Sequence, residues 1–351
     1  MEKKLNKNKV LLGLSGGVDS TAAALLLQEK GYSVSGYYFD VTGNNTEGRK
    51  EAETLARQLG IGLICEDVSS EFDAKIISDF CRGYCSGRTP NPCVICNPLV
   101  KFAKLLETAD RTGAYYIATG HYSRLTKDEK SGLYYITRAA NLKKDQSYML
   151  YRLGQEVLSR LLLPLGDFES KDDIRMLVGQ KGLHNAGKKD SQEICFLADG
   201  QDHAGFIRAK GYTSPQGNFV DQSGRVLGRH EGIINYTIGQ RKGLGIALGA
   251  PVYVTAINSE KNEVVLGKNE DLFTKKVLCK DCFFTCARSQ NLDGKRVTAK
   301  IRYLAQPASA TLHLAGDMAY VIFDEAQRAP AAGQSLVIYD GEKVLGGGFI
   351  V

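Results

Sequence analysis

Short apolar runs alternate with amphipathic stretches over the first 120 residues of the chain. Four apolar runs have the length of buried strands, at 10–14, 34–39, 63–68 and 115–119. Helical periodicity fills the intervals between them, at 20–30, 47–59 and 98–111. This order of elements predicts an α/β fold with a doubly wound, mainly parallel sheet and helices on both of its faces.

The predicted ends of these helices coincide with residues that commonly stop or start a helix. Gly31, Gly60 and Gly113 each follow a helical run, at the position where a residue in the left-handed backbone conformation commonly ends a helix. Asn97 followed by Pro98 is typical of an N-cap and a first helical position. We therefore expect the third helix to begin directly after Asn97.

The pattern changes after about residue 200. Two helical stretches precede the change, at 145–162 and 170–180. Beyond it turn sequences become dense, and apolar and polar residues alternate as in antiparallel sheet in "PVYVTAI", "EVVLG", "RVTAKIRY", "SATLHLA" and "AYVIFD". We expect three domains: a catalytic domain over 1–204, a small β-rich central domain over 205–275, and a C-terminal antiparallel β-barrel over 276–351.

Composition and charge narrow the class of protein only a little. The chain has 351 residues, is 43% hydrophobic and carries a net charge of +6, which permits a polyanionic partner without requiring one. No apolar run approaches the roughly 20 residues that cross a bilayer. The basic start "MEKKLNKNK" lacks the apolar stretch of a signal peptide, so the expected location is the cytoplasm.

Nine cysteines without an export signal favour free thiols, metal ligands or catalytic thiols over a disulfide framework. Three fall in predicted helices or strands and are expected to be small buried residues: Cys65, Cys81 and Cys85. Three more have the spacing C-x2-C-x3-C and are expected in strands, with a structural zinc site as the alternative: Cys279, Cys282 and Cys286. Cys93 and Cys96 stand at the start of a predicted helix, whose dipole is expected to lower a thiol pKa.

The glycine-rich stretch "GLSGGVDST", residues 13–21, joins the first predicted strand to the first helix. Its glycines let successive backbone N–H groups surround an anion, and the helix adds its positive end. Asp19 would repel a phosphate unless Mg²⁺ lay between them, so the loop predicts a nucleotide bound with magnesium. The lysine of the P-loop pattern is missing, which disfavours transfer of a terminal phosphoryl group.

The pattern S-G-G-x-D-S resembles the PP-loop of the ATP pyrophosphatases, which cleave ATP between the α and β phosphates. Five further segments then occur in order: "GRTPNPCVICN", "TGHY", "KDQSYML", "KKDSQEICF" and "NYTIGQRKGLGI". Together they resemble the tRNA-specific 2-thiouridylase family along nearly the whole chain. The resemblance implies that ATP adenylates the C2 carbonyl oxygen of the wobble uridine in tRNA. Sulfur from a cysteine persulfide then replaces that oxygen, giving 2-thiouridine, AMP and pyrophosphate.

The resemblance also implies roles for single residues. Cys96 matches the nucleophile of the family, and Cys195 matches the cysteine that carries the persulfide. The implied ATP contacts are Gly13, Leu14, Ser15, Gly16, Gly17, Val18, Asp19, Ser20, Phe39 and Gly120. The residues implied to face the target base are Asn91, Pro92 and Cys93. The residues implied to touch tRNA are His121, Lys144, Asp145, Gln146, Arg302, Tyr303 and Gln334.

For His121 a buried or capped neutral histidine remains the alternative. The implied partners are tRNAs reading glutamate, lysine and glutamine codons, and a cysteine desulfurase or sulfur-relay protein. The acceptor uridine must be flipped out or lie in a single-stranded loop, which a wobble base satisfies.

The chain departs from the family pattern at Cys93, where many members have an aspartate proposed as an acid or base. With Cys96 and Cys195 it supplies three thiols that suit a [4Fe–4S] cluster using sulfide, which we keep as an alternative. The segment "DVTGNNTEGRK" after Phe39 also lacks an expected tryptophan-containing loop. Two rival functions remain: another PP-loop amidotransferase or synthetase, and a regulator that binds nucleotide and tRNA without turnover. Neither needs a pair of reactive cysteines.

Overall fold

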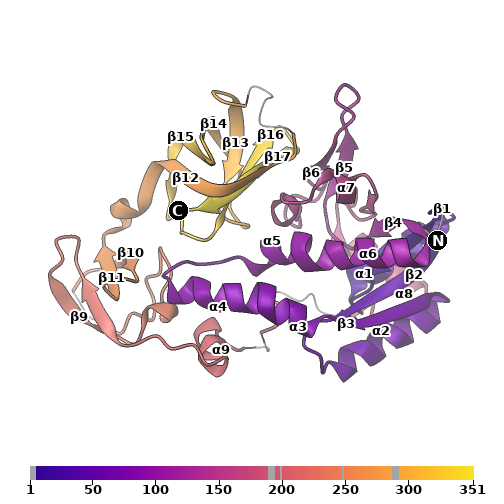
Figure 1. Ribbon diagram of the computed structural model, residues 1–351, viewed down its shortest axis with the longest axis horizontal. Helices are drawn as coiled ribbons and strands as arrows, with labels where there is room; N and C mark the ends of the chain where they lie inside the picture. The colour runs from indigo at the N-terminus through magenta and orange to yellow at the C-terminus, as the bar shows by residue number, and fades with distance from the viewer. Residues whose placement is uncertain (1–4, 189–193, 198–199, 247–248, 287–291) are drawn as a thin grey trace. The chain divides into compact units, whose positions relative to one another are not determined.

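The computed structural model describes residues 5–188, 194–197, 200–246, 249–286 and 292–351. It divides into two compact units, which we describe separately (Figure 1). The first unit consists of Met1–Lys75, Cys93–Phe196 and Glu342–Val344. The second consists of Ile76–Pro92, Leu197–Gly341 and Leu345–Val351. Among the described residues, no helix is long and apolar enough to cross a membrane.

A five-stranded parallel sheet forms the centre of the first unit. Its strands are β1 (Asn6–Gly13), β2 (Ser33–Asp40), β3 (Gly62–Asp67), β4 (Ala114–Ala118) and β7 (Leu161–Leu162). They lie in the order β3-β2-β1-β4-β7, so β2 and β4 flank β1 on opposite sides. The predicted doubly wound sheet is confirmed. Because the strand order reverses at β1 and β4, a crevice opens at their carboxyl ends, where such sheets bind ligands.

Four main helices cover the sheet: α1 (Val18–Glu29), α2 (Thr46–Leu59), α6 (Phe102–Thr112) and α8 (Lys171–Gln180). Val10 and Leu12 of β1 belong to a buried cluster with residues of α1, α2 and α8. Leu11, equally buried, points to the other face because strand side chains alternate, and α6 contacts β1 and β4. Gly31, Gly60 and Gly113 have the left-handed φ expected after a helix, at 84°, 67° and 77°.

Two expectations about local structure in the first unit are wrong. The stretch 145–162 is not one helix but a 3₁₀ turn, η3 (Ser147–Leu150), then α7 (Gln155–Leu158) and β7. Asp145 explains the break, because its carboxylate accepts hydrogen bonds from the backbone of Ala139 and Ser147 and so stabilises a turn.

Asn97 is not an N-cap. The helix α5 (Pro92–Cys96) runs directly into a π-helical turn, η2 (Asn97–Lys101), and then into α6. The Asn97 side chain instead donates to the carbonyl of Met149 at 2.8 Å. A tertiary hydrogen bond thus takes the place of the expected local cap.

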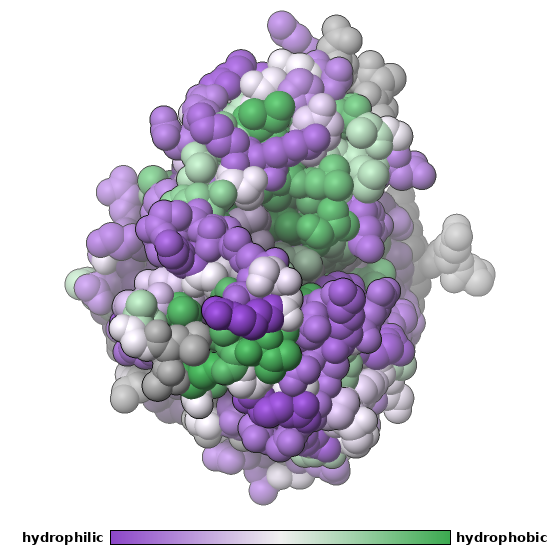
Figure 2. Space-filling model, turned by 90° about the vertical axis from the view of Figure 1, so that its left-hand side faces the viewer, coloured by the Kyte–Doolittle hydropathy of each residue, from purple (hydrophilic) through white to green (hydrophobic). Residues whose placement is uncertain are grey.

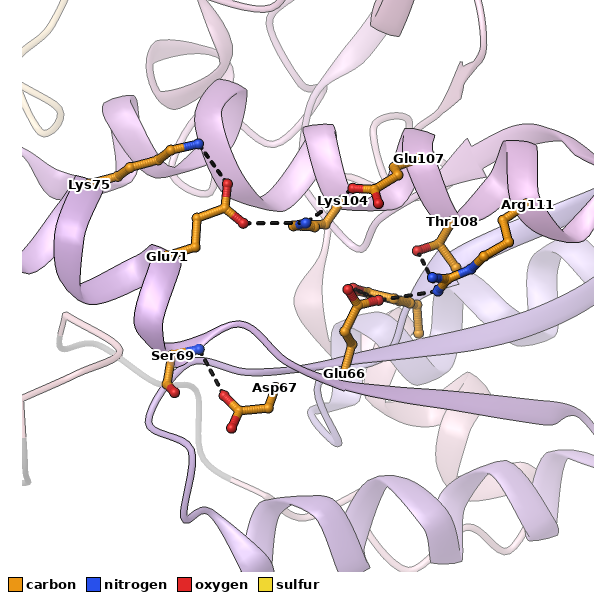
Figure 3. A network of polar contacts seen from close by, with 10 residues as sticks. Glu66, Asp67, Ser69, Glu71, Lys75, Lys104, Glu107, Thr108 and Arg111 are labelled. Carbon is orange, nitrogen blue, oxygen red and sulfur yellow. Dashed lines mark hydrogen bonds and ion pairs between the residues drawn. The ribbon is translucent and has the colours of Figure 1, made fainter.

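Charged side chains tie α6 to the edge of the sheet (Figure 3). The Lys104 ammonium bridges Glu71 of α3 (Ser69–Phe72) at 3.3 Å and Glu107 at 3.1 Å. Arg111 binds Glu66 of β3 at 3.3 Å. Exposed pairs of this kind stabilise a fold little, but they fix the position of α6 and hence of the segment that leads into it. The unit also contains η1 (Asp73–Ile77, continuing into the second unit) and the hairpin β5 (Arg124–Lys127) and β6 (Tyr134–Thr137).

The second unit contains a four-stranded sheet in the order β10-β11-β8-β9. Its strands are β8 (Gly217–Val220), β9 (Val226–His230), β10 (Tyr253–Asn258) and β11 (Glu263–Gly267). The pair β8 and β11 is parallel, which corrects the expectation of a purely antiparallel sheet. The connection over 231–252 is long enough to return the chain for this pairing. Short helical segments are α4 (Ser78–Cys85), α9 (His203–Ala209), η4 (Ile233–Asn235) and η5 (Asn269–Leu272).

Six antiparallel strands complete the second unit as a closed barrel, which confirms the predicted C-terminal barrel. They are β12 (Phe273–Phe284), β13 (Arg296–Lys300), β14 (Ala308–Ala315), β15 (Met318–Arg328), β16 (Ser335–Asp340) and β17 (Lys343–Ile350). Their order is β12-β15-β14-β13-β16-β17, and pairing of β12 with β17 closes the ring. Closure leaves no open strand edge within the barrel. The boundaries expected at 204 and 275 stay predictions.

Polar and charged side chains cover most of the face drawn in Figure 2, with smaller apolar areas between them. The larger exposed apolar side chains of the second unit include Val226, Phe273, Leu304 and Ile322. Leu304, 85% exposed, stands in the turn that also carries Arg302 and Tyr303.

Candidate active site

A cavity of about 250 Å³ lies in the first unit at the carboxyl ends of β1 and β4. Seven of the ten residues implied to bind ATP line it: Gly13, Leu14, Ser15, Asp19, Ser20, Phe39 and Gly120. Tyr38, Lys101, Thr119, His121 and Gln146 complete its lining. The cavity is therefore at the crevice that the strand order predicts.

The glycine-rich loop over 13–21 has the geometry of an anion-binding turn. Gly16 has a φ of 79°, which a residue with a side chain rarely adopts. The carbonyl of Gly17 accepts hydrogen bonds from the hydroxyls of Ser20 at 3.0 Å and Thr21 at 2.9 Å. Asn185 donates to the carbonyl of Gly16 at 3.1 Å. These hydrogen bonds occupy the carbonyl oxygens of Gly16 and Gly17 within the protein. Such an arrangement is expected of a loop that presents its N–H groups to an anion.

Gly120 lies close against the backbone at Asp19, in the other loop at the cavity. A Cβ at this position would lie 2.8 Å from the carbonyl carbon and 2.9 Å from the carbonyl oxygen of Asp19. Those atoms belong to the backbone and cannot move aside as a flexible side chain would. Only glycine lets the loop after β4 pack against the start of α1. Position 120 therefore requires glycine for a structural reason, in addition to its implied contact with ATP.

Asp19 is neutralised by a lysine that the sequence did not reveal. The Lys171 ammonium of α8 lies 2.6 and 2.8 Å from the two carboxylate oxygens, and the Tyr122 hydroxyl donates to one of them at 2.7 Å. The Lys171 side chain is only 10% exposed. The loop lacks a P-loop lysine, but α8 brings a cation to it from 152 residues away.

The Cys93 and Cys96 thiols lie within the short helix α5, and the expectation of lowered thiol pKa values is wrong. Burial raises the pKa of both thiols, and this effect exceeds the opposing charge of Lys101. The backbone N–H of Lys101 also hydrogen-bonds Cys96 and favours its thiolate. Desolvation inside the protein therefore outweighs any helix-end effect.

Cys195 shares the same electrostatic surroundings. The residue is exposed, yet desolvation of its thiol raises the pKa to about 12. The charges of Cys93 and Cys96 raise that pKa further, whereas the charge of Lys101 lowers it. Three thiols from two distant segments thus interact with one another and with one cation. Of the two lysines that precede Cys195 in this segment, Lys188 pairs with Glu51, and Lys189 lies outside the described part of the chain.

Lys101 connects the cavity with the thiols. Its side chain lines the cavity, and its charge lowers the pKa of all three thiols. Sequence reasoning missed it because a lone lysine inside a helical run usually points to solvent. Lys101 stands five residues after Cys96 in the sequence. The π-helical turn η2, which ends at Lys101, brings it to the site.

His121 is neutral at physiological pH. Burial, followed by the charge of Lys101, lowers its pKa to about 3. Its Nδ1 is hydrogen-bonded to the Thr119 hydroxyl at 2.8 Å, and its ring stacks on Phe102. The neutral, hydrogen-bonded alternative therefore describes this residue, and its contact with tRNA stays a prediction.

The residues implied to touch tRNA in the first unit also support the local fold. Gln146 accepts from the backbone N–H of Tyr122 at 2.8 Å, and the Gln146 N–H donates back to the carbonyl of Tyr122. Asp145 is buried in the turn described above, and Lys144 is half-buried. Cys93 belongs to this unit, whereas Asn91 and Pro92 belong to the second. Their contacts with tRNA and the target base stay predictions.

In the second unit the implied tRNA contacts likewise make internal bonds. Arg302 donates to the carbonyls of Arg328 and Ala329, each at 2.8 Å. Gln334 donates to the carbonyl of Thr89 at 2.8 Å. Tyr303 lies beside the Lys300 ammonium, 5.7 Å from the ring centre. These contacts do not test recognition of tRNA.

Over the described part of the chain, no three His, Cys, Asp or Glu side chains are placed to hold a metal ion. The iron–sulfur and zinc alternatives therefore gain no support there. Cys65 lies on β3 and Cys81 and Cys85 on α4, as expected, although only Cys81 is fully buried. Cys279 and Cys282 lie on β12, also as expected, whereas Cys286, which was expected in a strand too, lies beyond the end of β12 at Phe284.

The fold and the cavity define a PP-loop nucleotide-binding α/β protein with two β-rich appendages. Family models match 8–199 (tRNA methyl transferase HUP domain), 205–268 (tRNA methyl transferase PRC-barrel domain) and 274–350 (aminomethyltransferase β-barrel domain). The chain is 44% identical over 359 residues to the tRNA-specific 2-thiouridylase MnmA of Clostridioides difficile (strain 630), covering 99% of this chain and 98% of that protein.

Two further relatives agree with this match. The tRNA-specific 2-thiouridylase MnmA 1 of Clostridium tetani (strain Massachusetts / E88) is 46% identical over 361 residues, covering 100% of this chain and 98% of the relative. The enzyme of the same name, MnmA, from Syntrophomonas wolfei is 44% identical over 343 residues, covering 97% and 99%. The chain belongs to the tRNA-specific 2-thiouridylase family.

Because Gly120 lies so close to the backbone of Asp19, adding a single methyl group at position 120 should affect both stability and ATP binding. We expect Gly120→Ala to lower the free energy of unfolding by roughly 1–3 kcal/mol and to weaken ATP binding, because the added Cβ overlaps the backbone of Asp19. Urea unfolding and calorimetric ATP titration measure both effects. Gly62→Ala is the matched control, since a Cβ at Gly62 meets nothing within 4 Å. Wild-type ATP affinity in Gly120→Ala would contradict this role.

The Lys171 contact predicts a magnesium-dependent effect. In Lys171→Met the unpaired Asp19 carboxylate repels a triphosphate, so we expect ATP binding without Mg²⁺ to weaken by about tenfold. Saturating Mg²⁺ replaces the missing charge and makes the loss smaller. Lys171→Arg should retain binding, and Lys181→Met, at an exposed lysine just beyond the same helix, should have no effect. Equal losses with and without Mg²⁺ would refute the counter-ion role.

Proposed function

We propose that this protein is an ATP-dependent tRNA-uridine 2-sulfurtransferase, which replaces the C2 oxygen of the wobble uridine by sulfur. The observation that carries the proposal is Lys101. Lys101 lines the cavity and is also the cation that acts on Cys93, Cys96 and Cys195. Activation by a nucleotide and attack by sulfur would therefore occur at one site. Membership of the 2-thiouridylase family supports the same reaction.

ATP would bind on the loop over 13–21 with its phosphates toward the start of α1. Magnesium fits the donor set, because this ion commonly takes one carboxylate together with phosphate oxygens, and Asp19 supplies the carboxylate. When bound, the ion neutralises phosphate charge. The chain's own contribution is to orient Asp19 through Lys171 and Tyr122.

The uridine would be activated first. Its C2 oxygen attacks the α-phosphorus of ATP, pyrophosphate leaves, and the resulting adenylate turns a poor leaving group into a good one. The base must be extruded from its stack to reach the cavity. Asn91, Pro92 and Cys93 are the residues that we propose to face it.

Sulfur would be delivered in the second step. The terminal sulfur of a persulfide on Cys195 attacks C2 and forms a C–S bond. The Cys96 thiolate then attacks the Cys195 sulfur, and the S–S bond breaks with its electron pair moving to the substrate sulfur. The C=S bond forms, AMP leaves, and a Cys96–Cys195 disulfide remains, which an external thiol must reduce. The raised pKa values keep both thiols protonated at rest, and Lys101 favours the thiolate form when it is needed.

The finer assignments rest on the family resemblance. We propose tRNAs reading glutamate, lysine and glutamine codons as substrates, a cysteine desulfurase or relay protein as the source of the persulfide, and a cytoplasmic location. The residues proposed to touch tRNA are His121, Lys144, Asp145, Gln146, Arg302, Tyr303 and Gln334. An amidotransferase or a non-catalytic regulator would have no use for a reactive pair of cysteines such as Cys96 and Cys195.

Removal of either reacting thiol tests the proposal. We expect Cys96→Ser and Cys195→Ser to reduce 2-thiouridine formation by roughly a thousandfold or more, because each sulfur is a reactant. ATP binding should persist in both variants, and Cys65→Ser, on β3, should behave as wild type. Nucleoside mass spectrometry measures the product, and chromatography identifies AMP and pyrophosphate. Full activity in either variant, or ADP as the product, would refute the mechanism.

Cys93→Ser separates persulfide chemistry from cluster chemistry. In the persulfide mechanism Cys93 only faces the target base and is not a reactant, so we expect the variant to retain substantial activity with a desulfurase as donor. Anaerobically purified wild-type protein should then lack iron and acid-labile sulfide. Near-stoichiometric iron, together with loss of activity in Cys93→Ser, would establish the cluster alternative instead.

A further inference from the structure

A pair of thiols in the C-terminal barrel has no role in the proposed reaction. The Sγ atoms of Cys279 and Cys282 lie 3.7 Å apart on β12, and Cys282 Sγ also approaches the carbonyl oxygen of Cys279 at 3.6 Å. Cys279 is fully buried, whereas Cys282 is half-buried. Both belong to the second unit, whereas the nucleotide cavity and its three thiols lie in the first.

Regular strand geometry would not bring these two side chains together. Residues three apart on a strand point to opposite faces of a sheet. Here Asp281 has a positive φ of 51°, and the pairing of β12 with β17 shifts register between Lys280 and Phe283. The bulge turns both sulfurs to the same side.

The neighbouring strand leaves space for the two sulfurs. A Cβ at Gly348 of β17 would lie 3.0 Å from each of them and 2.7 Å from the carbonyl oxygen of Lys280. The glycine therefore removes the side chain that would fill the gap beside the thiols. Two separate features, the bulge in β12 and Gly348 in β17, converge on the same pair.

We propose that Cys279 and Cys282 form a redox-active dithiol, a modification site that closes to an intramolecular disulfide on reaction with a small-molecule disulfide. The Cys282 thiolate, the more accessible of the two, attacks one sulfur of the small disulfide. A mixed disulfide forms and one small thiolate leaves. Cys279 then loses its proton to that thiolate and attacks the Cys282 sulfur, which expels the second small thiol. Two protein thiols and one small disulfide give one protein disulfide and two small thiols.

The arrangement favours a disulfide over a metal. A disulfide needs the sulfurs to approach from 3.7 Å to about 2.05 Å, which side-chain rotation at a bulge permits. Structural zinc needs four ligands, and the described residues offer no group of three. The interaction with Cys282 raises the pKa of the Cys279 thiol, consistent with Cys282 reacting first.

Peptide mapping of the full-length protein tests this inference. Reduced protein is treated with oxidised glutathione, alkylated, and digested with trypsin without reductant. Because Lys280 stands between the two cysteines, a Cys279–Cys282 bond joins peptide 277–280 to peptide 281–288. We expect this linked pair in wild type and its release by reductant. The readout is independent of tRNA thiolation, so it does not depend on the proposed function.

Matched variants identify the partners. Cys286→Ser removes the only other cysteine of peptide 281–288 and should keep the link, whereas Cys282→Ser and Cys279→Ser should abolish it. Gly348→Ala keeps both cysteines in the chain, but its Cβ crowds the two sulfurs and the carbonyl oxygen of Lys280, so it should lower the linked fraction at a fixed ratio of disulfide to thiol. A link that persists in Cys282→Ser, no link in oxidised wild type, or stoichiometric zinc on the pair would each overturn the inference.

Discussion

The active site depends on one close contact, between Gly120 and the backbone of Asp19. The order of the parallel sheet places the loops after β1 and β4 side by side, and the missing Cβ of Gly120 lets them touch. The cavity is lined by the residues on both sides of this contact, and Phe39 and Lys101 bound the same space from β2 and η2. A larger residue at position 120 would separate the loops and with them the two halves of the cavity.

Two lysines from outside the glycine-rich loop then supply the positive charge that the proposed chemistry at the cavity needs. The loop over 13–21 carries a carboxylate and no cation of its own. Lys171 reaches that carboxylate from α8, and Lys101 faces the thiols and the cavity from η2. One lysine thus balances the group that would hold magnesium, and the other offsets the cost of ionising buried thiols. Phosphate chemistry and sulfur chemistry are proposed to proceed together because Lys101 lines the cavity and Lys171 pairs with Asp19 of the same lining.

Sequence patterns within single segments predicted most of the fold. Contacts between segments that are distant in the sequence could not be predicted from such patterns. Apolar periodicity gave the parallel sheet, its main helices and the C-terminal barrel, because burial repeats at fixed spacing. Asn97 resembled an N-cap but bonds Met149 instead, and no local pattern records that partner. The motif over 13–21 identified the cavity, yet Lys171 was invisible because only the packing of α8 on α1 brings it to Asp19. The thiol pKa values were predicted with the wrong sign, since burial cannot be read from neighbouring residues alone.

We propose that Lys101 joins the nucleotide cavity and the thiols into one site, and the reactivity of the Cys96 thiol tests this connection. The rate of Cys96 alkylation can be followed by peptide mass spectrometry between about pH 6 and about pH 10 in wild type, Lys101→Met and Lys101→Arg. We predict an apparent pKa above the ordinary value of about 8.5 in wild type and a further rise in Lys101→Met, with Lys101→Arg unchanged. Superimposable profiles for wild type and Lys101→Met, or a wild-type pKa below the ordinary value, would show that Lys101 and burial do not set the reactivity of Cys96.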